Sequence, residues 1–270
     1  MKPQTISIIG GRGKIGSLFA DSFRSLEYAV LVSNQRNTDN TKLAQQGDVV
    51  IVSVPLENTE QVIQEIGPYV RKEALLTDFT SVKMKPMAAM LKYSNAEVIG
   101  GHPLFGPKVE SFKGQNMVLC PERGKEYLSW YKKTMEELGM KIYLMTAEEH
   151  DEIMAEKQVL VHLSNLYFAT TLANIKQEKN QPEISTPAYI LRLYAVKRML
   201  AQDPSLYSGI FFENPFTDQV MRAYEKSVKE VNTLVQGRNK TKLEKLLHSL
   251  QEEFKDPAAL RKKRVKIINE

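Results

Sequence analysis

The sequence predicts a doubly wound α/β domain over residues 1–146, followed by an all-helical domain over residues 147–270. In the first part, short β-branched apolar runs alternate with segments of helical period, which is the pattern of a parallel sheet covered by helices on both faces. A glycine-rich turn joins the first apolar run directly to the first helical segment. Beyond residue 146 the strand signals end, and only long helical patterns follow.

Seven apolar runs in the first part have the length and composition of strands. The run at residues 48–54 is nearly unbroken, as expected of a strand buried on both faces, and Pro55 ends it. Helical patterns lie between the runs, at residues 14–26, after Asn58 and at residues 125–138. The predicted strands are residues 5–10, 28–33, 48–54, 74–78, 97–100, 115–120 and 140–144. Their alternation with helices indicates crossover connections within one sheet.

The second part has helical patterns throughout. Gly237 stands where a helix should stop, and Pro187 and Pro204 stand at helix edges, where proline is tolerated. The predicted helices are residues 147–177, 188–202, 217–236 and 241–254, with a polar loop after the first. Their apolar faces exceed what one α/β domain can cover, so we expect a homodimer formed through the helical domain.

Composition and charge are those of an ordinary globular protein. Of 270 residues, 42% are hydrophobic and 26% are charged, with a net charge of +5. No apolar run approaches the ~20 residues of a membrane span, and the first run is too short for a signal peptide, so we expect a cytoplasmic protein without membrane contact. The basic run at residues 261–266 is interpreted as a solvated tail rather than a nucleic-acid site. Cys120 is the single cysteine, and no disulfide or metal site is expected.

The glycine turn matches the G-x-G-x-x-G pattern of dinucleotide-binding Rossmann domains. Gly11 allows the tight turn, Gly13 lets a pyrophosphate approach the backbone, and Gly16 lets the helix pack closely on the strand. The helix N-terminus adds amide donors and the positive end of its dipole. We therefore predict a nicotinamide dinucleotide site whose first segment is Gly11, Arg12, Gly13, Lys14, Ile15 and Gly16.

The end of the second predicted strand bears on the choice between NAD and NADP. An Asp or Glu there binds the ribose 2′-hydroxyl in NAD-specific sites, whereas this sequence has Ser33, Asn34 and Arg36. A hydroxyl, an amide and a guanidinium suit a 2′-phosphate, so NADP is favoured slightly over NAD. Val54 and Pro55 end the third strand at the same edge and are expected to line the cofactor pocket.

A histidine between glycines and prolines marks the candidate catalytic segment. His102 lies in the string GGHPLFGP, which predicts a constrained loop rather than a core face. Ser81 and Lys83 follow an earlier strand, at the edge where ligands gather. Histidine titrates near neutral pH and can accept a hydroxyl proton as hydride leaves the same carbon. His102 is therefore the candidate base, against the alternative of an ordinary loop histidine.

Seven strings together carry a resemblance to a known family. They are GGRGKIG at 10–16, VSVP at 52–55, TSVK at 80–83, GHPLFGP at 101–107, EHD at 149–151, VHL at 161–163 and RMLAQD at 198–203. With these strings the chain resembles the prephenate dehydrogenase family of tyrosine biosynthesis over most of its length. The resemblance implies a Rossmann domain with a helical dimerisation domain, and NAD(P)-dependent oxidative decarboxylation of prephenate to 4-hydroxyphenylpyruvate.

The same resemblance assigns roles to individual residues. It implies that His102 interacts with the C4 hydroxyl of the substrate and that Ser81 forms a hydrogen bond beside it. It places His162 in the substrate cleft, with Phe105 and Gly106 in the substrate-binding loop. The expected substrate is a small prephenate-like dicarboxylate.

One position departs from the family's pattern. The family carries an arginine early in the helix that precedes the RMLAQD string, where it binds a substrate carboxylate, and this position falls on Ile190. Arg192 is the candidate replacement, but it stands two residues further, about 200° around an α-helix. Either a local shift restores Arg192, or Lys197 or Arg198 binds the carboxylate, or the substrate is not prephenate.

The sequence leaves other functions open. A dehydrogenase of arogenate or of an aminated prephenate analogue needs the same residues, and Ile190 leaves room for it. A non-catalytic nicotinamide-binding regulatory protein is a further alternative, although the joint presence of His102 and Ser81 argues against it. An unrelated two-domain reductase has no need of the GHPLFGP string. No chorismate mutase segment precedes the first strand, so no fused mutase activity is expected. Of the other histidines, His150 is expected to join the domains, and His248 is expected to be exposed to solvent.

Overall fold

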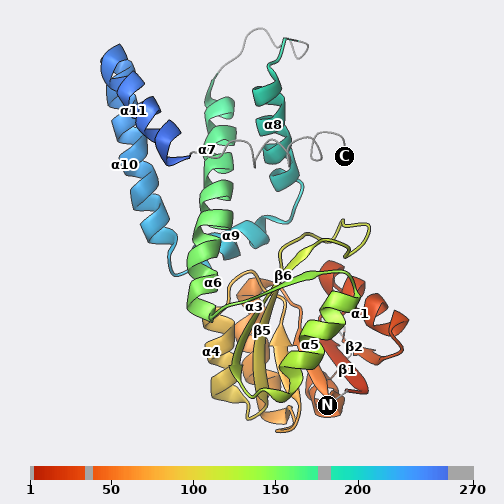
Figure 1. Cartoon of the computed structure of the whole chain (residues 1–270). Helices are drawn as coiled ribbons and strands as arrows, with labels where there is room; N and C mark the ends of the chain where they lie inside the picture. Colours follow the sequence, from red (N-terminus) through yellow and green to blue (C-terminus); the bar gives the residue numbers. More distant parts are fainter. Residues whose placement is uncertain (1–2, 34–38, 176–183, 255–270) are drawn as a thin grey trace. The chain divides into compact units, whose positions relative to one another are not determined.

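The structure is a computed structural model that describes residues 3–33, 39–175 and 184–254. The contacts between residues divide the chain into two compact units, Met1–Asp218 and Gln219–Glu270. Each unit is described by itself. The predicted boundary between the two domains lies inside the first unit and stays a prediction. Figure 1 shows the order of the elements along the chain.

A seven-stranded sheet forms the centre of the first unit. Its strands, in spatial order, are β2 (Ala29–Val32), β1 (Thr5–Ile9), β3 (Val49–Val52), β4 (Leu75–Asp78), β5 (Glu97–Pro103), β6 (Asn116–Arg123) and β7 (Lys141–Leu144). The strand order reverses its direction between β1 and β3, so the predicted doubly wound α/β fold is confirmed. In such sheets, ligands bind at the carboxyl ends of the strands beside that reversal.

One strand departs from the expected parallel arrangement. β6 pairs antiparallel with β5, with His102 opposite Val118, whereas the other neighbouring strands are parallel. Residues 104–115 connect β5 to β6 without a helix, and a parallel partner needs a crossover that usually contains one. The antiparallel pairing extends β5 through Pro103. It therefore places His102 on a strand, which corrects the expectation of a loop.

Helices cover both faces of the sheet. They are α1 (Lys14–Ser25), α2 (Asn40–Gln46), α3 (Leu56–Ile66), α4 (Met84–Tyr93) and α5 (Glu126–Glu137). Ile51 of β3 shares a buried cluster with Phe19 of α1 and Tyr131 of α5. Its neighbour Val50 shares a second cluster with Ile63 of α3. Successive side chains of β3 thus alternate between two apolar layers, as strand geometry requires.

Two of these helices have no counterpart among the predicted elements. α2 is short and buries only Ala44 of its own residues, so it shows no apolar period. α4 carries Pro86 in its first turn, where proline is tolerated because the N–H groups there have no helical partner. Proline inside an apolar pattern is normally a sign against a helix, which explains why sequence patterns miss α4.

The predicted helix after residue 146 is observed as three consecutive elements. They are α6 (Ala147–Met154), the π-helical turn η2 (Ala155–Leu160) and α7 (Val161–Asn174). Thr146 caps α6, because its hydroxyl accepts the N–H of Glu149 and the Glu149 carboxylate accepts the N–H of Thr146. The first unit continues with α8 (Pro187–Leu200), which was predicted, and α9 (Pro204–Glu213), which was not. Both helices begin at a proline, as the sequence indicates.

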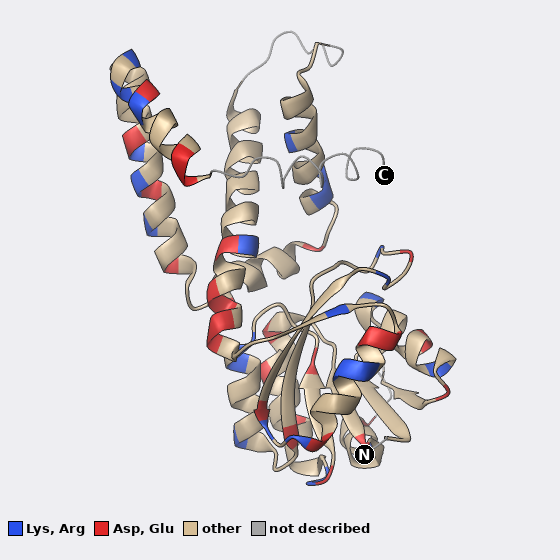
Figure 2. Ribbon diagram, in the orientation of Figure 1, with Lys and Arg blue, Asp and Glu red and all other residues tan. Residues whose placement is uncertain are grey.

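The second unit consists of α10 (Thr217–Gln236), which begins at the end of the first unit, and α11 (Lys240–Glu253). Neither helix has a buried residue, and basic and acidic residues are interspersed along both (Figure 2). The predicted basic tail at residues 261–266 lies outside the described residues. Within the described ranges, no helix has the length and apolar composition needed to cross a membrane.

Candidate active site

The glycine turn lies at the carboxyl end of β1, beside the end of β3. The Ser53 N–H donates to the Ile9 carbonyl over 2.8 Å, which holds the two strand ends together. Gly10 has a φ of 81°, a conformation that favours glycine, and its N–H donates to the Ser33 hydroxyl over 3.1 Å. A Cβ added at Gly16 would lie 2.6 Å from the Gly10 carbonyl oxygen. The turn and α1 therefore approach at a distance that requires glycine.

The N-terminus of α1 follows the turn directly. Gly13 precedes the helix and has no side chain to cap it, so the first N–H groups of α1 are available to an anion such as a pyrophosphate. Of the predicted cofactor residues, Arg12, Gly13, Lys14 and Pro55 are exposed, and Gly11, Ile15, Gly16, Ser33 and Val54 are half-buried or buried. Asn34 and Arg36 lie outside the described residues. The backbone of the turn fits a dinucleotide.

Replacing Gly16 with alanine is expected to weaken dinucleotide binding about 10- to 100-fold, because relieving the overlap with Gly10 costs about 1–3 kcal/mol. Calorimetric titration of the purified protein with NAD and with NADP measures the change. Gly106→Ala is the matched control for cofactor affinity, since an added Cβ there meets no atom within 4 Å. An unchanged affinity in Gly16→Ala would show that the cofactor binds elsewhere.

His102 is 3% exposed, and the strand around it is tightly packed. A Cβ added at Gly101 would lie 2.8 Å from the Asp78 carbonyl oxygen, and one added at Gly100 would lie 2.7 Å from the Met87 sulfur. The two glycines before His102 thus let β5 pack closely on the end of β4 and on α4. This packing fixes the backbone from which the histidine side chain extends.

A buried ion pair supports the same strand. Lys83 and Asp78 are fully buried, and the Lys83 ammonium pairs with the Asp78 carboxylate. Lys83 Nζ also donates to the Gly101 carbonyl over 2.8 Å. The Thr80 N–H donates to the Asp78 carboxylate over 3.0 Å. Residues of the TSVK string therefore hold the backbone next to His102.

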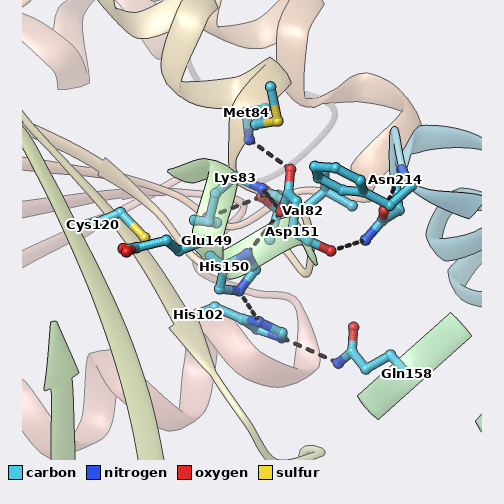
Figure 3. A network of polar contacts seen from close by, with 12 residues as sticks. Val82, Lys83, Met84, His102, Cys120, Glu149, His150, Asp151, Gln158 and Asn214 are labelled. Carbon is cyan, nitrogen blue, oxygen red and sulfur yellow. Dashed lines mark hydrogen bonds and ion pairs between the residues drawn. The ribbon is translucent and has the colours of Figure 1, made fainter. Parts of the chain in front are cut away.

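His102 contacts His150 of α6, and His150 contacts Asp151 of the same helix; all three side chains are buried (Figure 3). His102 Nδ1 lies 2.8 Å from His150 Nε2, and His150 Nδ1 lies 2.7 Å from Asp151 Oδ1. His150 lies 48 residues after His102 in the sequence, and sequence analysis predicts for it only a role in joining the two domains. In the structure, His150 contacts His102 directly.

Burial makes His102 a neutral histidine. Loss of hydration, followed by electrostatic interactions with His150 and Lys83, holds the pKa of His102 well below 6.5. Burial is also the largest cause of the lowered pKa of His150. A neutral imidazole has one unprotonated nitrogen, so His102 can accept a proton at neutral pH.

The other ring nitrogen of His102 faces η2. Gln158 Nε2 lies 3.4 Å from His102 Nε2. His162 and Asn165 follow four and seven residues further along the helix, on about the same face. Within the described chain, Gln158 Oε1, His162 Nδ1 and Asn165 Oδ1 are buried and have no hydrogen-bond partner. Buried polar atoms rarely stay unpaired, so this face is suited to a polar ligand. Sequence reasoning missed Gln158, whose spacing to His162 was the available signal.

Arg198, rather than Arg192, is the arginine whose charge acts on His162. Burial, and then the positive charge of Arg198, lowers the pKa of His162. The Tyr207 ring packs against His162 with a centroid distance of 4.8 Å. The Arg192 guanidinium carbon instead lies 5.6 Å from the centre of the Phe168 ring. Phe168 is six residues beyond His162, about 9 Å along α7, so Arg192 lies near another part of the helix.

The remaining predicted residues border this region. The Phe105 ring packs against Phe19 and Phe112, with centroid distances of 6.3 and 5.4 Å, and anchors the loop after β5 to the core. Gly106 follows in that loop. Ser81 is half-buried in the segment between β4 and α4, which also carries Thr80 and Lys83. Contacts of Phe105, Gly106 and Ser81 with a substrate stay predictions.

Comparisons with known proteins identify the family of the chain. A family model described as "Prephenate dehydrogenase, nucleotide-binding domain" matches residues 20–144, and "Prephenate dehydrogenase, dimerization domain" matches residues 146–252. The chain is 33% identical over 255 residues to the T-protein of Haemophilus influenzae, an alignment that covers 93% of this chain and 67% of that protein. It is 30% identical over 271 residues to a probable arogenate/prephenate dehydrogenase of Methanocaldococcus jannaschii, covering 93% and 61%. The chain thus spans 61–67% of the length of these two relatives.

A solved structure has the same fold. It is the crystal structure of prephenate dehydrogenase from A. aeolicus in complex with hydroxyphenyl propionate and NAD+, with a TM-score of 0.79 over 99% of both chains at 21% identity. The fold, the two adjoining family models and the identity to the T-protein all point to one assignment. The chain belongs to the prephenate dehydrogenase family.

Proposed function

We propose that the chain binds a nicotinamide dinucleotide at the glycine turn and oxidatively decarboxylates prephenate to 4-hydroxyphenylpyruvate, a step of tyrosine biosynthesis. The observation that carries the proposal is His102, a buried neutral histidine near the carboxyl edge of the sheet. Its Nε2 faces a helix whose buried polar atoms lack partners in the described chain. The family membership supports the choice of reaction, and the turn at Gly10 to Gly16 supports the cofactor.

The chemistry assigned to His102 is the handling of one proton. The nicotinamide, when bound, takes up the hydride that leaves C4 of prephenate. His102 Nε2 accepts the C4 hydroxyl proton as positive charge grows at that carbon. The C1 carboxylate leaves as carbon dioxide, and its bonding electrons complete the aromatic ring. His102 returns its proton to the phenolate oxygen, and assistance of this kind is worth about 10²–10⁴ in rate. Ser81 is proposed to donate a hydrogen bond near the same hydroxyl.

The substrate carboxylates are proposed to bind along η2 and α7. Arg198 provides the positive charge near His162 that Ile190, which stands at the family's arginine position, does not provide. Gln158 and His162 offer buried polar atoms on the same helix face. Arg198 therefore replaces Arg192 as the proposed carboxylate ligand.

We also propose a second candidate substrate, for which Ile190 leaves room. Arogenate and aminated prephenate analogues keep the ring carboxylate of prephenate but carry an amino group that prephenate lacks. A dehydrogenase of either compound uses the same base and cofactor. A preference for such a substrate would arise at Ile190, which stands where the family has an arginine.

The cofactor type, the domain boundary and the assembly complete the proposal. NADP is proposed over NAD, because residues 33–36, which follow β2, include Ser33, Asn34 and Arg36 and no carboxylate. The two family models meet at residues 144–146, which supports the proposed boundary at residue 146. A homodimer through the helical domain is proposed because α7, α8 and α9 expose large apolar side chains, among them Leu166, Tyr167, Ile190, Tyr194 and Phe212.

Reduced-nicotinamide absorbance tests the proposal. The purified protein is given prephenate or arogenate, each with NAD and with NADP. Turnover of prephenate supports the main proposal, and turnover of arogenate alone supports the second candidate. Silence in all four mixtures, with cofactor still bound, would reject prephenate and arogenate as substrates and favour either a different ring substrate, such as an aminated prephenate analogue, or a nicotinamide-binding protein without turnover.

The pH profile follows from the low pKa of His102. Only the neutral imidazole accepts a proton, and burial keeps the pKa of His102 well below 6.5. We therefore expect kcat/KM to stay constant as the pH falls through 6.5 and to decline only at lower pH. A plot of kcat/KM against pH for prephenate measures this limb. A decline centred at or above 6.5 would contradict the assigned environment of the base.

A further inference from the structure

The contacts of Asp151 set the direction of the hydrogen bonds that reach His102 (Figure 3). Asp151 Oδ1 accepts the N–H of Lys83 over 2.7 Å, and Oδ2 accepts the N–H of Met84 over 2.9 Å, at the start of α4. Its backbone carbonyl accepts the side-chain amide of Asn214 over 2.8 Å. Two backbone donors thus fix the carboxylate of Asp151, and its oxygens act as acceptors.

An accepting carboxylate determines where the proton of His150 lies. Asp151 Oδ1 can pair with His150 Nδ1 over 2.7 Å only if that nitrogen carries hydrogen. A neutral His150 then has no hydrogen on Nε2, which must accept from His102 Nδ1 over 2.8 Å. A neutral His102 with hydrogen on Nδ1 has its lone pair on Nε2. The N–H of Gln158 faces that atom, which agrees with an acceptor there.

We infer that His150 and Asp151 are positioning residues that hold His102 in the tautomer whose unprotonated Nε2 faces the substrate. The inference rests on the proposed function for its kinetic consequence, but the tautomer itself is a property of the protein without substrate. In serine proteases a buried Asp holds the catalytic histidine in its working tautomer in the same manner. Here the support passes through a second histidine.

A structural role for the same contacts makes different predictions. Asp151 links α6 to α4 and to Asn214, so its loss would lower stability whatever happens at His102. His150 is fully buried and contacts both Asp151 and His102. The tests therefore need readouts that depend on the tautomer rather than on folding.

The first test is spectroscopic and uses the wild-type protein. Nitrogen-15 NMR of the histidine side chains distinguishes a protonated from an unprotonated ring nitrogen, and a His102→Asn sample assigns the His102 signals. The inference predicts hydrogen on Nδ1 and none on Nε2 at pH 7. Hydrogen on Nε2 of His102 would overturn it, whether or not prephenate is a substrate.

The second test is kinetic. His150→Phe keeps a planar ring but removes the acceptor, and kcat for prephenate is expected to fall about 10²-fold or more while KM is unchanged. His150→Gln can place an acceptor oxygen near the former Nε2 position and is expected to recover much of the loss. In the His102→Asn background, His150→Phe should have no further effect, because both act through one base. An unchanged kcat in His150→Phe, or an additional loss in the double variant, would overturn the inference.

Discussion

Replacing His102 with asparagine is expected to lower kcat/KM for prephenate by about 10²–10⁴-fold. The asparagine amide can still donate a hydrogen bond toward His150, so the buried contact keeps a donor. It has no atom basic enough to take the C4 hydroxyl proton. The loss should appear in kcat and not in cofactor affinity, because His102 is not part of the glycine turn. Steady-state kinetics and cofactor titration measure the two quantities.

His248→Asn is the matched control for this substitution. His248 is exposed on α11, where its Nδ1 lies 3.1 Å from Gln251 Oε1 of the same helix. Its replacement should leave both kcat and KM unchanged. Full turnover in His102→Asn would show that His102 is not the catalytic base.

Replacing Lys83 with methionine is expected to lower the free energy of unfolding by about 3–5 kcal/mol. Lys83 and Asp78 are both fully buried, so the substitution leaves a carboxylate in the core without its cation. The Gly101 carbonyl, which accepts from Lys83 over 2.8 Å, also loses its donor. Urea unfolding of the wild type and the variant, monitored by circular dichroism at pH 7, measures the difference.

The exposed pair of Arg24 and Asp21 provides the comparison. Their side chains are 47% and 76% exposed on α1, and pairs of this kind contribute at most about 1 kcal/mol. Arg24→Met should therefore change the unfolding free energy far less than Lys83→Met. Equal changes in the free energy of unfolding for the two substitutions would contradict the larger contribution expected of the buried pair.

Much of the fold follows from local sequence patterns. The apolar run ending at Pro55 and the glycine turn at Gly11 to Gly16 are confirmed as a central strand and a strand–helix connection, because both patterns are local. The direction of β6 is not local, since it depends on a loop that contains no helix. α4 escapes prediction because Pro86 lies within its apolar pattern.

The candidate site was predictable only in part. His102 is visible in the sequence because its neighbours are glycines and prolines, and Lys83 stands near it in a recognisable string. The contact between His102 and His150 joins β5 to α6 and exists only once the sheet and the first helix of the second part are packed together. Gln158 and Arg198 belong to ordinary helical patterns. Their place near the base or near His162 depends on how η2, α7 and α8 pack, which no local pattern records.

The most direct test of the central claim is the stoichiometry of the reaction with prephenate deuterated at C4. Reduced nicotinamide, carbon dioxide and 4-hydroxyphenylpyruvate are measured together after complete consumption of the substrate. Hydride transfer coupled to decarboxylation predicts equal amounts of the three products, with the deuterium in the reduced nicotinamide. Reduced nicotinamide without carbon dioxide, or an aromatic product without deuterium in the cofactor, would contradict the account.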